Sequence, residues 1–177
     1  PLYVTQLGGI YLDLLNVYQV YSEAVASAVQ ANGEMATGHG EVRAMRAAKR
    51  EILRLISTFI EKCAEPEAPP ALVATSFVPP LLEPVLGDYG RSIAEARDSE
   101  VLVLLATTVD KLHDLVANEV PRILDAVFEP TLRMITRNFE DFPEHRLAFF
   151  KLLKAVNTHC FAALFAIPPE HHKLIVD

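Results

Sequence analysis

Apolar residues recur every three or four positions along almost the whole chain of 177 residues. This spacing places side chains on one face of an α-helix, whereas a half-buried strand would alternate apolar and polar residues. No convincing pair of strands is present in the pattern. The spacing therefore predicts an all-α protein. In the first segment the apolar set is Leu7, Ile10, Leu14, Val17, Tyr21, Ala24 and Ala28.

Helix-breaking residues divide this pattern into segments of about twenty residues. The run "QANGEMATGHG" at 30–40 ends the first segment, and "EPEAPP" at 65–70 ends the second. Pro79, Pro80 and Pro84 predict a kink or break in the third, because an interior proline removes a backbone hydrogen bond. The predicted helices reach to about 29 and then cover about 41–63, 70–91, 99–112, 118–135 and 142–164, with a further helix after 168.

Two of these segments resemble each other. "VPPLLEPVL" at 78–86 and "VPRILDAVF" at 120–128 match at seven of nine positions and are offset by 42 residues. That offset suits HEAT units of two helices each, and so favours a solenoid over a closed bundle. We therefore expect an alpha-alpha superhelix of antiparallel helix pairs. Its expected repeats are 1–67, 68–117 and 118–166, with another beginning at 167–177. The start at Pro1 and the end in "HHKLIVD" suggest a piece of a larger protein.

Composition excludes several classes of function. A net charge of −7 and a pI near 5.4 argue against general binding of nucleic acid or of an anionic membrane, which needs clustered positive charge. Apolar runs such as "VLVLLATTV" are too short to span a bilayer, so no membrane insertion is expected. Two cysteines without CxxC spacing indicate a reducing compartment.

The segment at 142–161 contains residue types that catalysis uses, namely Glu144, His159 and Cys160. A cysteine or metal hydrolase is therefore one hypothesis. Helix geometry favours a structural role, because Cys160 falls on the apolar face near a helix C-terminus, where the dipole raises rather than lowers a thiol pKa. His171 and His172 are adjacent and cannot form the i, i+4 pair of a zinc-binding helix. We expect no catalysis, no metal and no cofactor.

One polar pattern stands out in this acidic chain. Four arginines of the second predicted helix fall within an arc of about 80° at 100° per residue, opposite its apolar face. A solvated face is the simpler interpretation, and a contact surface for an acidic partner is the alternative. The sixth predicted helix carries a weaker basic row. The candidate protein-binding residues are Arg43, Arg46, Arg50, Arg54, Lys151 and Lys154.

Several segments carry a resemblance to a known family. They are "IYLDLLNVY" (10–18), "QANGEM" (30–35), "FVPPLLEPVLGDY" (77–89), "LDAVFEPTLRMI" (124–135) and "FPEHRLAFFKLLKAVNTHCF" (142–161) followed by "AIPP". With these segments in order, the chain closely resembles the exportin-1 family of karyopherins, the nuclear export receptors. The segments "GHG" (38–40) and "EKCAEPEAPPA" (61–71) depart from the family pattern, which suggests a diverged member.

This resemblance implies a ring-like HEAT solenoid that wraps Ran-GTP, carries cargo with leucine-rich export signals and contacts FG nucleoporins while it shuttles between nucleus and cytoplasm. It implies no catalysis. The chain would form part of the C-terminal arch, and neither Cys63 nor Cys160 falls in the motif of the family's export-signal groove. The second, fourth and sixth helices would line the concave face. An unrelated HEAT scaffold for protein–protein interaction is the alternative.

Overall fold

The α-helices follow most of the segments in which apolar residues recur at helical spacing. The computed structural model describes residues 2–63, 68–137 and 140–166, and in these residues it contains helices and no strand. Short 3-10 helices, η1 (Glu34–Gly38), η2 (His113–Glu119) and η3 (Phe161–Ala166), lie between or after the long ones. The α-helices are α1 (Leu2–Asn32), α2 (Gly40–Glu61), α3 (Pro70–Ser76), α4 (Val78–Arg91), α5 (Ser99–Leu112), α6 (Val120–Arg137) and α7 (Pro143–His159).

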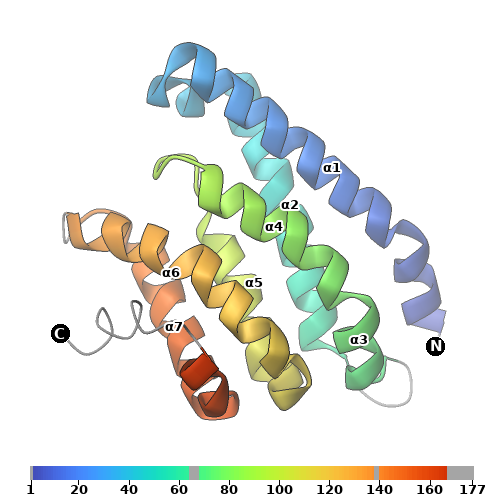
Figure 1. Ribbon diagram of the computed structural model, residues 1–177. Helices are drawn as coiled ribbons and strands as arrows, with labels where there is room; N and C mark the ends of the chain where they lie inside the picture. Colours follow the sequence, from blue (N-terminus) through green and yellow to red (C-terminus); the bar gives the residue numbers. More distant parts are fainter. Residues whose placement is uncertain (1, 64–67, 138–139, 167–177) are drawn as a thin grey trace.

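The long helices form two layers. Figure 1 shows α1, α4 and α6 side by side, with α2, α5 and α7 behind them. We call α1, α4 and α6 the first layer and α2, α5 and α7 the second layer. Each first-layer helix is followed in the chain by its second-layer partner, and neighbouring pairs pack through α2, α5 and α7 above all. The chain is thus an all-α solenoid of antiparallel helix pairs, as the repeat pattern predicted.

The predicted break in the third segment is confirmed. Phe77 separates α3 from α4, and the two helices meet at 51°. Pro79 and Pro80 lie in the first turn of α4, where a missing N–H removes no helical hydrogen bond, while Pro84 lies inside α4 without ending it. No single helix of the described residues is long and apolar enough to cross a membrane. Only the bent pair of α3 and α4 passes that test, and only when both are counted together.

The buried face of α1 differs from the predicted one. Tyr11, Leu15 and Tyr18 are buried, whereas Ile10 and Val17 are 50% and 42% exposed. Apolar residues lie on two sides of this helix, and spacing alone does not tell which side the neighbouring helices cover. Gly33 ends α1 with a positive φ of 72°, a conformation that favours glycine.

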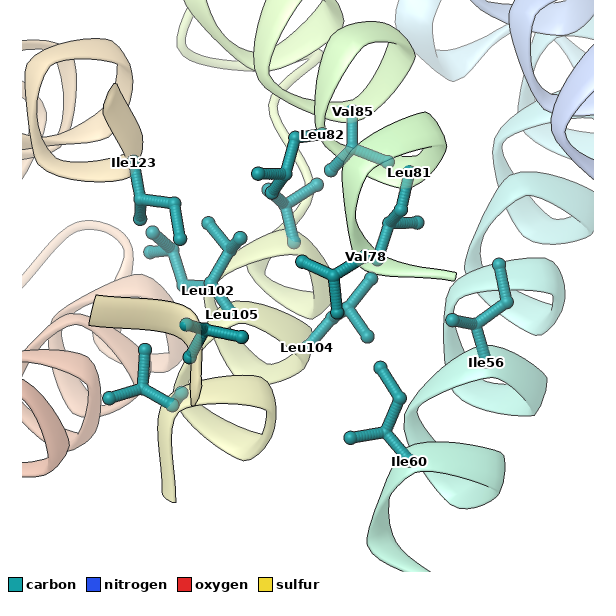
Figure 2. Packing of buried hydrophobic residues seen from close by; sticks show 14 of the residues in the cluster. Ile56, Ile60, Val78, Leu81, Leu82, Val85, Leu102, Leu104, Leu105 and Ile123 are labelled. Atoms are coloured by element: carbon teal, nitrogen blue, oxygen red, sulfur yellow. The ribbon is translucent and has the colours of Figure 1, made fainter. Parts of the chain in front are cut away.

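One apolar core runs through both layers. Figure 2 shows it where α2, α4 and α5 meet, with Ile123 of α6 at its edge. Leu81, Leu82 and Leu104 are fully buried there, and each such side chain contributes about 1.5–3 kcal/mol through removal from water. A smaller cluster of Val25, Val42 and Ala96 closes the far end of α1 and α2.

Two predicted helix boundaries are wrong. The helix expected over 142–164 ends at His159, because Cys160 leaves helical geometry and a 3-10 helix follows. The helix expected from Asn118 begins at Val120, after η2. Apolar spacing of three continues through a 3-10 turn, so it does not mark where an α-helix stops. The helix predicted after 168, with His171 and His172, lies outside the described residues.

Candidate protein-binding face

The C-terminal half of the arginine row of α2, Arg50 and Arg54, lies at the junction with α5. Arg43 and Arg54 are exposed, whereas Arg46 and Arg50 are partly buried. The row was expected to stand opposite the apolar face, and that expectation is wrong for Arg46. The buried face of α2 includes Leu53 and therefore extends further round the helix than the sequence suggested.

Acidic residues at the start of α5 hold two of these arginines. Arg50 Nε lies 3.2 Å from Asp98 Oδ2, and Arg54 donates through Nε and Nη2 to Glu100 Oε1 at 3.0 Å. Asp98 also caps α5 by accepting from the Glu100 amide at 3.1 Å. Carboxylates near a helix N-terminus are favoured by the helix dipole. Burial raises the pKa of Asp98, although the hydrogen bond from the Glu100 amide and the charges of Arg50 and Arg46 oppose that rise.

Arg46 occupies a less satisfied position in the same row. Its Nη1 donates to the Thr37 carbonyl at 3.5 Å, while its Nε is buried and has no hydrogen-bond partner among the described residues. Burial lowers the pKa of this guanidinium. Arg46 therefore belongs to the packing between α2 and η1, and less of it is available to a partner than of Arg43.

We call the polar contacts between α2 and the start of α5 the seam, and similar contacts continue between α5 and α7. Ser99 Oγ donates to Glu144 Oε2 at 3.4 Å. His145, in the first turn of α7, is 8% exposed. Burial lowers its pKa, partly offset by a hydrogen bond to the Arg97 backbone. The sequence held a signal for this position, because His145 precedes Phe149 by four residues on the buried side of α7.

The two candidate lysines of α7 line a groove. Lys151 and Lys154 face Ala106, Thr107 and Asp110 of α5 across a groove of about 430 Å³. Both lysines are exposed, and neither forms an ion pair with a described residue. The groove therefore presents two exposed positive charges to solvent.

The suspected hydrolase residues do not meet. Glu144 lies at the first turn of α7 beside Ser99, fifteen residues or about 22 Å of helix from His159. His159 stacks on His113 with ring centroids 4.1 Å apart, and its Nε2 lies 3.2 Å from Asp110 Oδ1. Cys160 Sγ donates to the His113 carbonyl at 3.3 Å, and burial raises the pKa of this thiol. A buried, protonated thiol is a poor nucleophile.

A buried charged cluster between α1, α2 and α4 was not predicted from the sequence. Lys49 Nζ lies 2.8 Å from Asp88 Oδ2, and the Tyr18 hydroxyl donates to the same oxygen at 2.8 Å. The Lys49 ammonium also lies 5.0 Å from the centre of the Tyr18 ring. A signal existed, because Lys49 and Asp88 each interrupt the apolar face of their helix. We call these three residues the buried cluster.

Charge is unevenly shared between the layers. The second-layer helices carry nine lysines and arginines against six acidic residues, whereas the first-layer helices carry four against six. Lys49 is one of the nine and is buried against Asp88 of the first layer, so eight lysines and arginines against six acidic residues remain at the surface of the second layer, in a chain of net charge −7. A positive surface on an acidic protein attracts acidic partners and repels basic ones.

Comparison with known proteins gives a consistent result. A family model described as CRM1 C terminal matches residues 6–177. Protein EXPORTIN 1B of Arabidopsis thaliana is 48% identical over 175 residues, and Exportin-1 of Drosophila melanogaster is 47% identical over 176. Exportin-1 of Schizosaccharomyces pombe is 41% identical over 172 residues. These alignments cover 97–99% of the chain, which spans 16% of the length of each relative.

Proposed function

The chain belongs to the family described as CRM1 C terminal, and from this membership we propose that it forms part of the C-terminal arch of a nuclear export receptor. In the whole receptor, this solenoid would assemble with Ran-GTP and with cargo that carries leucine-rich export signals. FG nucleoporins would contact the receptor as it passes between nucleus and cytoplasm. The segment acts by binding and by curvature, without catalysis or a cofactor.

The observation that carries this proposal is the match across nearly the whole chain, at 41–48% identity, to exportins of plants, animals and fungi. The match also removes the alternative that the chain is a HEAT scaffold unrelated to this family. Within the proposal, the second layer faces the partners. Its net positive charge, with the arginine row and the two lysines of the groove, suits an acidic surface.

An uncovered apolar flank supports a place in a longer solenoid. On α1, Ile10, Val17 and Val20 are 50%, 42% and 61% exposed, and on α2 Leu55 is 43% exposed. Single exposed apolar residues are ordinary, but several on one helix indicate a face that another element covers. In a solenoid each repeat buries its apolar surface against both neighbours. We propose that a further helix pair of the receptor stacks on this flank.

A segment exchange tests the proposed function. Residues 6–177 replace the matching segment of the Drosophila receptor, in Drosophila cells depleted of their own receptor. The readout is the nuclear-to-cytoplasmic ratio of a fluorescent reporter that carries a leucine-rich export signal. We expect the chimera to restore export. A chimera that is expressed at the parental level and binds neither Ran-GTP nor the reporter would overturn the proposal.

Two matched charge reversals test which layer faces the partners. Arg43→Glu with Arg54→Glu changes two exposed arginines of the second layer, and Arg122→Glu with Arg133→Glu makes the same change in net charge on the first layer. We expect the second-layer pair to weaken assembly with Ran-GTP and cargo more, and more so at low salt. Equal effects of the two pairs would mean that only total charge matters.

A further inference from the structure

The groove between α5 and α7 has a floor of small side chains. Ala106 of α5 and Ala155 of α7 are 8% and 5% exposed, and Thr107 and Thr158 stand beside them. Small residues at these positions leave about 430 Å³ open between the two helices. Lys151, Lys154 and Thr158 on its lining are exposed to solvent, so the space suits side chains of a partner better than a buried small molecule.

Lys151, Lys154 and Thr158 of α7 line this groove, and the exposed Leu147 precedes them on the same face of the helix, outside the lining. Leu147, Lys151, Lys154 and Thr158 follow one another at spacings of four, three and four residues, which places them on one face of the helix. The two lysines are separated by about 4.5 Å along the helix axis, at 1.5 Å per residue. Leu147 is 60% exposed at the N-terminal end of the row. This face of α7 therefore presents an apolar side chain beside the groove, followed by two positive charges within it.

Other charged groups around the groove limit what fits it. Asp110 lines the groove from α5, near the C-terminal end of the row. Its Oδ1 lies 3.2 Å from His159 Nε2. Glu144 and Glu100 lie at the opposite end of α7 and α5, each with a partner. An acidic ligand is therefore attracted to the middle of the groove and repelled at its ends. A long polyanion would meet these carboxylates.

We propose that this groove binds a short acidic segment of a partner protein, with one apolar side chain against Leu147 and two carboxylates against Lys151 and Lys154. Charge complementarity carries the choice of occupant, since neither lysine has an acidic partner among the described residues. The inference rests on the proposed function only in treating the second layer as the side that faces partners.

Defined peptides test this binding mode. The probe is a fluorescent, N-acetylated ten-residue peptide with one leucine followed by two glutamates, and its matched control carries glutamines in place of the glutamates. Fluorescence anisotropy with the full 177-residue chain measures both Kd values at low and moderate salt. We expect the glutamate peptide to bind more tightly, by about fivefold at low salt, because two exposed ion pairs contribute only modestly.

Matched variants locate the site. Lys151→Gln with Lys154→Gln should remove the preference for glutamate, whereas Lys62→Gln with Lys111→Gln, the same change in net charge at exposed lysines outside the groove, should leave it within twofold. Leu147→Ala should weaken both peptides equally and independently of salt. Leu115→Ala, another exposed leucine, should change neither.

Three outcomes would overturn the inference. They are equal affinity of the parent chain for both peptides, equal loss in the two lysine pairs, and tighter binding of a single-stranded oligonucleotide than of the glutamate peptide. Any of these, together with export restored by the chimera, would remove the groove as a peptide site and leave the proposed function standing. Failure of the chimera with intact peptide binding would do the reverse.

Discussion

Lys49 and Arg54 lie five residues apart on α2, and both pair with acidic residues of another helix. The Lys49 side chain is 4% exposed and meets Asp88 inside the molecule, whereas the Arg54 side chain is 53% exposed and meets Glu100 at the surface. One helix therefore carries both a buried ion pair and a solvent-exposed ion pair. The buried cluster holds α1, α2 and α4 together in the interior. The pairs Arg50–Asp98 and Arg54–Glu100 join α2 to the start of α5 at the surface.

Burial is what separates the two. A charge in the interior loses its hydration, so it is stable there only with an opposite charge and further hydrogen bonds. Asp88 has both, since it accepts from Lys49 and from the Tyr18 hydroxyl. At the surface, water and salt replace a lost partner at little cost. The following predictions test this difference, beginning with the largest effect.

Removal of Lys49 should be the most damaging change. Lys49→Met leaves the Asp88 carboxylate buried without its counter-charge, and breaking one side of a buried pair costs about 3–5 kcal/mol. Urea unfolding followed by circular dichroism measures the free energy of unfolding. We expect a large drop in the midpoint, with the slope retained.

A double variant provides the control for Lys49→Met. Adding Asp88→Asn removes the orphaned charge and keeps an oxygen that accepts from the Tyr18 hydroxyl. The double variant should therefore unfold at a higher urea concentration than Lys49→Met alone. If Lys49→Met costs no more than an exposed arginine substitution, burial does not govern these pairs and the comparison fails.

Loss of one hydroxyl should have the next largest effect. Tyr18→Phe removes a hydrogen bond to a buried carboxylate, and such charge-assisted bonds contribute about 1.5–3 kcal/mol. Tyr89→Phe is the matched control, because its hydroxyl lies 2.8 Å from Thr131 Oγ1 in an equally buried but neutral contact worth about 0.5–1.5 kcal/mol. Equal losses in the two variants would show that the charge on Asp88 adds nothing.

The repeat architecture could be predicted because the patterns that indicate it extend over whole segments of the sequence. The apolar spacing predicted helices throughout, the 42-residue offset predicted their arrangement as a solenoid of pairs, and the prolines after Phe77 predicted the break between α3 and α4. The buried face of α1 could not be predicted, because Ile10 and Tyr11 are both apolar and only neighbouring helices decide between them.

The polar contacts were harder to predict. From sequence alone, a lysine in a helix is expected to be solvated unless its partner on another helix is known. Lys49 and Asp88 are 39 residues apart in the chain. The arginine row was visible as a pattern, but its partners Asp98 and Glu100 come from α5. Spacing along one helix gives the direction of a side chain and leaves its partner open.

His145 should produce a moderate effect that depends on pH. Its pKa is lowered in the folded chain by burial, so the unfolded chain, with an ordinary pKa near 6.5, takes up the proton first. The contribution of His145 to stability is therefore complete above pH 6.5 and falls as the pH drops from there toward the folded pKa. Arg97 and Arg46 add to this by repelling the proton, and Glu144 opposes it.

Urea unfolding between pH 5 and pH 8 measures the effect of His145. Compared with the parent chain, His145→Gln should lose less stability between pH 6.5 and pH 5, whatever its stability at pH 8. His39→Gln, at an exposed histidine before α2, is the control and should keep the parental slope. A parental slope in His145→Gln would mean that the buried ring takes up its proton as an exposed one does.

The smallest effect is expected for the exposed end of the arginine row. Arg54→Ala removes the contacts with Glu100 and Glu51, but both ends of this seam remain open to water, which hydrates the freed carboxylates. The change in urea midpoint should be smaller than that of Tyr18→Phe and should disappear in 1 M salt, where the Debye length is about 3 Å. Arg43→Ala, at the exposed start of the same row, is the matched control and should leave the midpoint unchanged. A salt-independent loss in Arg54→Ala as large as that of Lys49→Met would mean that the seam, and not burial, holds the second layer together.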